Sequence, residues 1–145
     1  MTLEWTPLPS VVAQTYFVTA EKASHLEEPL VQATQIVSQE IAANFDAQGR
    51  PEGWQELNEA TVERRGSSEP ILFVTGNLYN QATSPTSWAV GGGGQEWDAE
   101  LIDVTDYGRF HVTGTVNMPV RDWTFVPDDA LDAIEQVFWD WLEVG

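Results

Sequence analysis

Residues 30–46, LVQATQIVSQEIAANFD, decide the fold because their apolar side chains recur at the spacing of one helical face. The face is made of Leu30, Ala33, Val37, Ile41 and Phe45. Gln48-Gly49-Arg50-Pro51 follows, and glycine and proline directly after a periodic run are typical of a helix end. The pattern therefore predicts an amphipathic helix that ends near Asp46.

The start of this helix has two interpretations. Ser24-His25-Leu26-Glu27 has the Ser-x-x-Glu form of a capping box, which favours a start at Ser24. Pro29 would then lie in the helix interior, where a proline removes a backbone hydrogen bond. The sequence therefore leaves open either a turn at Ser24 or a helix that holds Pro29 in its first turn.

A second amphipathic helix is predicted at the C-terminal end. Pro127-Asp128-Asp129 opens it, with acidic residues where the helix dipole favours them. Its apolar face is expected to consist of Leu131, Ile134, Phe138, Trp141 and Leu142.

Short β-rich runs lie on both sides of a polar connection at about 47–70. Strands are predicted at 14–19, 87–90, 96–104, 110–113 and 119–125, with a flexible tip at 91–94. The expected fold is one α+β domain over residues 1–145. In it, a mainly antiparallel sheet is packed by the N-terminal and C-terminal helices. A connection longer than about 12–15 residues is usually functional or mobile in a compact domain, so 47–70 is a candidate functional loop.

The charge of the chain is strongly one-sided. Its 145 residues include six Lys+Arg and 23 Asp+Glu, which gives a formal net charge of −17 at pH 7. Such a protein releases few counterions from DNA, so nucleic-acid binding is not expected. Seven Trp, six Phe and three Tyr argue for a folded chain, because disordered acidic chains are poor in aromatic residues. An acidic, lysine-poor globule is typical of salt-loving hosts, and neither a membrane segment nor a secretory signal is expected.

Motifs that carry chemistry are nearly absent. The chain has no cysteine, and its two histidines, His25 and His111, belong to no metal or catalytic motif. The four glycines at 91–94 lack the lysine of a phosphate-binding loop. A calcium loop starting at Asp103 would place Gly114 where a bidentate glutamate belongs. We therefore expect no catalytic, cofactor or metal site.

Three segments, in order, carry a resemblance to a known family. The first comprises Phe45, Gly53, Trp54, Leu57, Thr61, Arg64 and Arg65. The second is Pro-Ile-Leu-Phe-Val-Thr-Gly-Asn-Leu at 70–78. The third, at 107–125, contains Tyr-Gly-Arg-Phe-His-x2-Gly-Thr followed by Met-Pro-Val-Arg-Asp-Trp, and the C-terminal helix comes after it. Over about residues 14–143 the chain resembles the virion morphogenesis family of tailed phages, the Mu-like tail-completion proteins.

The resemblance implies an α+β structural protein rather than an enzyme. Its place would be the virion, at the neck or the head-proximal end of the tail, after synthesis in the host cytoplasm. There it would act in tail completion, tail termination or head–tail joining, as a ring (hexameric in our prediction) through which DNA passes. The implied partners are copies of itself, head–tail connector proteins and tail-tube proteins, without sequence-specific nucleic-acid binding or membrane contact. The acidic composition fits a virus of a halophilic archaeal host.

Residues in the three segments are the candidate assembly contacts. They are Trp54, Leu57, Arg64, Arg65, Gly76, Leu78, Arg121 and Trp123. The 47–70 loop is expected to be mobile in the free subunit and to become ordered against a neighbouring copy. In that hypothesis Trp54 lies outside the core and fills a pocket on the neighbour, while the arginines meet carboxylates.

Two alternatives remain at this stage. An acidic protein that mimics DNA and inhibits a nucleic-acid enzyme would explain the charge directly. A small carbohydrate-binding or hydrolytic domain would use the tryptophans and carboxylates. Competition with DNA for an enzyme would support the first alternative, and sugar-dependent quenching of tryptophan fluorescence would support the second.

Overall fold

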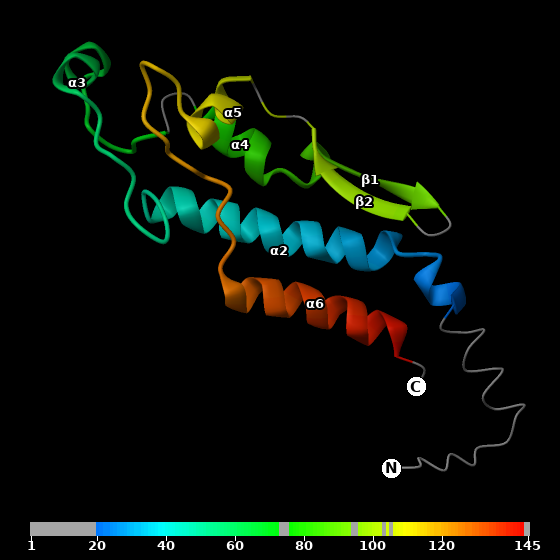
Figure 1. Ribbon diagram of the computed structural model, residues 1–145. Helices are drawn as coiled ribbons and strands as arrows, with labels where there is room; N and C mark the ends of the chain where they lie inside the picture. The colour runs from blue at the N-terminus through cyan, green and yellow to red at the C-terminus, as the bar shows by residue number, and fades with distance from the viewer. Residues whose placement is uncertain (1–19, 73–75, 94–95, 103, 105, 144–145) are drawn as a thin grey trace, which may run out of the picture.

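The helices and strands of the computed structural model form an α+β fold, as predicted (Figure 1). The structure describes residues 20–72, 76–93, 96–102, 104 and 106–143. Its helices are α2 (Glu27–Asp46), α3 (Glu59–Arg65), α4 (Asn77–Thr83), α5 (Asp106–Thr113) and α6 (Asp128–Leu142), with a 3-10 turn, η1, at Pro85–Ser87. The strands are β1 (Trp88–Gly93) and β2 (Glu96–Leu101). No helix among these residues is long and apolar enough to cross a membrane.

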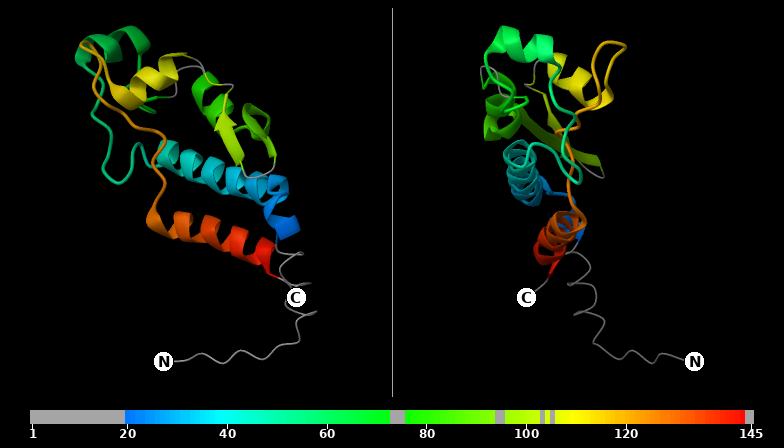
Figure 2. Two further views of the ribbon diagram at one scale, coloured as in Figure 1. Left: turned by 45° about the vertical axis from the view of Figure 1, so that its right-hand side comes forward. Right: turned by 90° about the vertical axis from the view of Figure 1, so that its left-hand side faces the viewer.

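Helix α2 lies in the middle of the molecule. It contacts α6 on one side and α4 with the β1–β2 hairpin on the other, as the views in Figure 2 show. It begins at Glu27 and holds the buried Pro29 in its first turn, so the second interpretation of its start is correct. No side chain caps it, because its N-cap residue is Leu26, which has no side-chain acceptor. The Ser24 hydroxyl donates a hydrogen bond to the Glu21 carbonyl at 2.7 Å.

The core gathers around Phe45, at the C-terminal end of α2. The Phe45 ring makes edge contacts with Trp54 at 5.6 Å and Tyr79 at 5.4 Å, and it lies 6.4 Å from Trp123. The buried cluster consists of Ile41, Phe45, Trp54, Ile71, Leu72, Leu78, Ala82 and Trp123. Two residues of the predicted helical face therefore enter the core together with side chains from distant segments.

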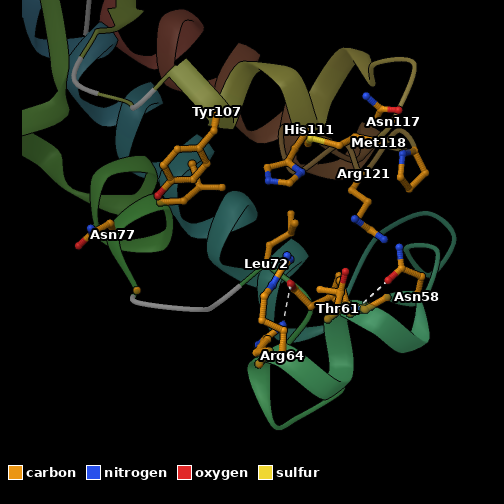
Figure 3. A pocket seen from close by; sticks show the side chains of 16 residues that line it. Asn58, Thr61, Arg64, Leu72, Asn77, Tyr107, His111, Asn117, Met118 and Arg121 are labelled. Atoms are coloured by element: carbon orange, nitrogen blue, oxygen red, sulfur yellow. Dashed lines mark hydrogen bonds between the residues drawn. The ribbon is translucent and has the colours of Figure 1, made fainter.

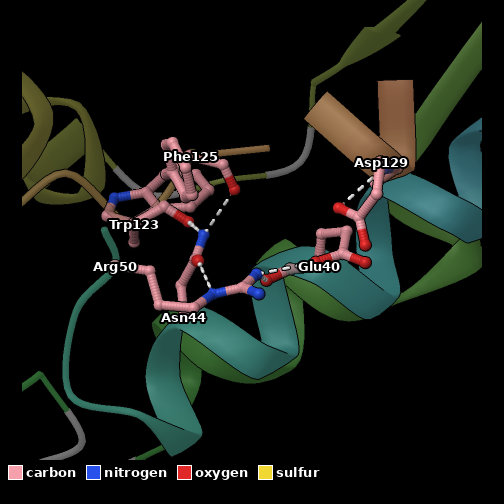
Figure 4. Close-up of polar contacts among 7 residues, drawn as sticks. Glu40, Asn44, Arg50, Trp123, Phe125 and Asp129 are labelled. Carbon is pink, nitrogen blue, oxygen red and sulfur yellow. Dashed lines mark hydrogen bonds and ion pairs between the residues drawn. The ribbon is translucent and has the colours of Figure 1, made fainter. Parts of the chain in front are cut away.

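A polar network behind this core joins α2 to two irregular segments (Figure 4). The Asn44 side-chain amide donates hydrogen bonds to the carbonyls of Trp123 and Phe125, each at 2.8 Å. Arg50 Nε donates to Asn44 Oδ1 at 2.8 Å, and Arg50 Nη2 forms an ion pair with Glu40 at 2.7 Å. The network holds the chain after Asp46 and the chain before α6 against the same end of α2.

The β1–β2 hairpin has the predicted antiparallel pairing. Trp88 pairs with Leu101 at one end and Gly93 with Glu96 at the other. Gly92 has φ of +149°, and a Cβ there would lie 2.3 Å from the Glu96 carbonyl oxygen, so glycine permits this close approach. Among the described residues the sheet has only these two strands.

Two other strand predictions are wrong, and a third lies outside the described residues. Residues 110–113 belong to α5. This helix packs closely against Leu78, since a Cβ on Gly108 would lie only 2.7 Å from the Leu78 side chain. Residues 119–125 alternate in burial, but their carbonyls accept hydrogen bonds from the Asn44 and Trp54 side chains instead of from a strand. The predicted strand at 14–19 is not among the residues that the structure describes.

The connection at 47–70 contains a helix, although its composition predicts a loop. Helix α3 occupies Glu59–Arg65, and the Asn58 side chain caps it by accepting a hydrogen bond from the Thr61 amide at 2.8 Å. Gly66 ends the helix at φ of +84°, a conformation that suits glycine. This helix forms one wall of the site described next.

Candidate functional site

A cleft of about 610 Å³ opens at the end of the molecule that carries α3 and α5. Figure 3 shows Tyr107 and His111 of α5 facing Thr61 and Arg64 of α3, with Leu72 between them. The segment 117–121 and the start of α4 complete the wall. The lining residues are Leu57, Asn58, Thr61, Arg64, Arg65, Ile71, Leu72, Gly76, Asn77, Leu78, Tyr107, His111, Asn117, Met118, Pro119 and Arg121.

Six of the eight candidate assembly residues line this cleft. They are Leu57, Arg64, Arg65, Gly76, Leu78 and Arg121. They come from three segments that are well separated in the sequence, and the fold brings them to one place. Their contact with another protein stays a prediction.

Trp54 and Trp123 lie in the core instead. Trp54 is 9% exposed, and its Nε1 donates a hydrogen bond to the Asp122 carbonyl at 3.1 Å. Trp123 is 4% exposed, and its Nε1 donates to the Gly108 carbonyl at 2.8 Å. The expectation that Trp54 stands outside the core for a neighbouring copy is therefore wrong.

A tight turn brings Trp54 back onto Phe45. Gly49 adopts φ of +113°, and the Trp54 amide donates a hydrogen bond to the Gln48 carbonyl at 2.7 Å. A Cβ on Gly49 would lie 2.5 Å from the Trp54 nitrogen, so only glycine fits this turn. The chain after α2 thus reverses at once and buries its large aromatic residue.

Two arginines of the cleft hold its walls together. Arg121 donates hydrogen bonds to the carbonyls of Gln55 at 2.9 Å and Glu56 at 3.1 Å. Arg65 donates to the carbonyls of Pro70 and Ile71 and so fixes the chain that leads to α4. Burial lowers the pKa of Arg121, although a guanidinium stays charged at neutral pH. Arg64, by contrast, is exposed at the edge of the cleft.

His111 is a titratable side chain whose pKa is shifted by its place in the cleft. Burial, and next the charge of Arg121, lower the pKa of His111, so its ring is neutral at pH 7. Its Nδ1 atom is buried and has no hydrogen-bond partner among the described residues. The ring stands edge-on to Tyr107 at 6.2 Å.

The pH dependence of stability should report this histidine. An unfolded histidine titrates near pH 6.5, above the folded His111, so the unfolded chain binds more protons in the window below about pH 6.5. The free energy of unfolding should therefore fall as the pH decreases through about 6.5 and below. His111→Gln should flatten this slope, as urea unfolding at several pH values can measure. Equal slopes for the variant and the wild type would contradict the assignment.

Sequence reasoning missed several residues that build this end of the molecule. Asn58 had a readable signal, because asparagine before a helical turn is a favoured cap. Asn44 had no such signal in the sequence, since an asparagine inside a helix is usually exposed. Within the described parts of the chain, no group of three or more His, Asp or Glu side chains could hold a metal ion.

Comparison with known proteins found no relative. No protein-family model matches the chain, and neither curated proteins nor solved structures gave a match. The resemblance to the virion morphogenesis family therefore stays a prediction that rests on the three segments quoted above.

Proposed function

We propose that this chain is a structural, non-enzymatic subunit of the neck or the head-proximal tail end of a tailed virion. It assembles with copies of itself into a ring through which DNA passes, and it joins head–tail connector and tail-tube proteins. One observation in the structure supports the proposal most directly. Residues of all three family-like segments lie around one open cleft, although they are spread between Leu57 and Arg121.

The lining of the cleft suits contact with a protein. Its side chains include apolar groups such as Leu72 and Met118 and exposed charge at Arg64. Stable protein interfaces combine an apolar centre with a polar rim, and arginine and aromatic residues are enriched in them. A volume of about 610 Å³ lies within the usual range of binding pockets, about 300–1,000 Å³.

The charge suits a channel for DNA. A ring of subunits that each carry −17 presents a negative lumen to the phosphates, so DNA slides through it without adhering. Repulsion between subunits is the opposing effect. Salt weakens it, because the screening length falls from about 10 Å at 0.1 M to about 3 Å at 1 M.

The proposal is tested by the assembly state of the purified chain. Sedimentation and negative-stain electron microscopy in about 2 M KCl, where screening is strong, should show closed rings. In a second test, the chain should co-purify with connector and tail-tube proteins encoded by neighbouring genes. A chain that stays monomeric and captures neither would overturn the proposal. Competition with DNA for a nuclease or polymerase would favour the DNA-mimic alternative instead.

A further inference from the structure

Helix α6 is covered less than its sequence predicts. Among its 15 residues only Ala130 is buried, whereas α2 buries seven of 20. Leu131, predicted to face inward, is 50% exposed, and Trp139 is 59% exposed. The helix packs along α2, and Figure 2 shows it at the flank of the molecule, away from the hairpin.

The exposed apolar residues of α6 stand among carboxylates. Leu131, Glu135 and Trp139 are spaced four residues apart, so they follow one another along one face, which we call the outer stripe. Trp139 Nε1 donates a hydrogen bond to Glu135 Oε1 at 3.1 Å, so the indole and the carboxylate lie side by side. The neighbouring Asp132 and Asp140 are also exposed.

The cleft offers the complementary chemistry. Three of the six Lys and Arg residues of the whole chain line it, although the chain carries 23 acidic residues. Its apolar lining includes Tyr107 and Met118, and Arg64 is exposed at its edge. Its chemistry therefore suits an indole with an adjacent carboxylate.

We propose that the cleft of one copy receives Trp139 and Glu135 from the outer stripe of a second copy. The indole fills the apolar part of the cleft, and the Glu135 carboxylate meets the Arg64 guanidinium. This inference rests on the proposed function, because it specifies the contact between neighbouring subunits.

A second copy is the occupant that the structure favours. In Figure 1, α3 and the C-terminal end of α6 lie at opposite ends of the molecule, so a chain cannot place its own Trp139 in its own cleft. Each copy nevertheless carries one cationic apolar cleft and one anionic apolar stripe. A contact between two different surfaces is heterologous, and repeated contacts of this kind close into a ring or continue as a filament.

Two single variants test the contact from its two sides. Trp139→Ala removes the inserted side chain, and Arg64→Glu reverses the charge that receives Glu135. Each should weaken self-association about 30-fold or more, the size of an interface hot spot, as sedimentation equilibrium can measure. The controls are Phe110→Ala, an exposed aromatic residue outside both surfaces, and Arg109→Glu, the same charge change outside the cleft. Neither control should change the assembly state.

Mixing the two variants gives the decisive result. The Trp139→Ala copy keeps an intact cleft and the Arg64→Glu copy keeps an intact stripe, so one sound contact can form between them. At a concentration where each variant alone is monomeric because its self-association is weakened, the mixture should contain one-to-one heterodimers and nothing larger. Variants that assemble like the wild type, or a mixture that stays monomeric, would overturn the inference.

Failure of this contact is distinguishable from failure of the proposed function. If the wild-type chain forms rings that both variants preserve, the rings use another surface, and only the contact is overturned. If the wild-type chain forms open filaments that both variants abolish, the contact is supported and the ring is overturned. A wild-type chain that is monomeric under all salt conditions overturns both.

Discussion

Trp54→Ala is expected to lower the free energy of unfolding of the single chain by about 3–5 kcal/mol, the usual cost of deleting a buried tryptophan side chain. Trp54 is 9% exposed and stands edge-on to Phe45 at 5.6 Å. Its loss leaves a cavity between α2 and the chain before α6, and it leaves the Asp122 carbonyl without its donor. Urea unfolding followed by circular dichroism measures the change.

A milder variant and a surface control make this prediction decisive. Trp54→Phe keeps an aromatic ring in the core but loses the Nε1 hydrogen bond, so it should cost less than the alanine variant. Trp139→Ala removes a tryptophan that is 59% exposed and should change stability by about 0.5 kcal/mol or less. If Trp54→Ala unfolded at the same urea concentration as Trp139→Ala, Trp54 would not be a core residue.

The local patterns of the sequence predicted the elements whose periodicity is strong. Ile41 and Phe45 recur at helical spacing and are both in the core, and α6 begins at Asp128, directly after the predicted Pro127. The predicted strand at 96–104 likewise contains β2, whose burial alternates from residue to residue. In α2 and β2 the side chains that set the period, such as Phe45 and Leu101, also make tertiary contacts, whereas Leu131 belongs to the predicted face of α6 and is exposed.

Short β-rich runs were predicted less well because tertiary contacts decide their state. Phe110–Thr113 has strand-forming residues, but Gly108 lets α5 approach Leu78 and accept a hydrogen bond from Trp123. Pro119–Phe125 alternates as a strand does, yet side chains from α2 and the 47–70 connection take its carbonyls. These hydrogen-bond partners are distant in the sequence, so the residue pattern of a seven-residue run does not reveal them.

The place of Trp54 was predicted wrongly for a similar reason. The composition of 47–70 is polar and rich in glycine and proline, which is typical of a loop. Burial of Trp54 depends on the reversal at Gly49 and on a gap beside Phe45 that distant segments complete. Six residues of the cleft were named as candidate assembly contacts through the resemblance. The cleft itself was not predicted, because spacing along the chain does not give distances between α3, α4 and α5.

Asn44→Ala is expected to destabilise the chain by about 3 kcal/mol or more, because three buried or partly buried hydrogen bonds are lost at once. Asn44 is 0% exposed and donates to the carbonyls of Trp123 and Phe125, each at 2.8 Å. It also accepts a hydrogen bond from Arg50 Nε at 2.8 Å. The alanine variant leaves two carbonyls and one guanidinium N–H of this network without their partner. The control is Asn80→Ala on the exposed face of α4, which should change the free energy of unfolding by no more than about 0.5 kcal/mol.

Asn44→Asp separates the hydrogen bonds from the volume of the side chain. Aspartate has nearly the same shape and still accepts the hydrogen bond from Arg50, but at pH 7 it directs a carboxylate oxygen at two carbonyl oxygens. We therefore expect Asn44→Asp to be strongly destabilised at pH 7 and to lose less stability relative to the wild type as the pH falls. The reason is that a protonated carboxyl can again donate to one of the two carbonyls. Urea unfolding of both chains at pH 7 and at about pH 4.5, near the ordinary range of a carboxyl group, measures the difference. An Asn44→Asp chain as stable as the wild type at pH 7 would show that the two donated hydrogen bonds do not hold the segment before α6 against α2.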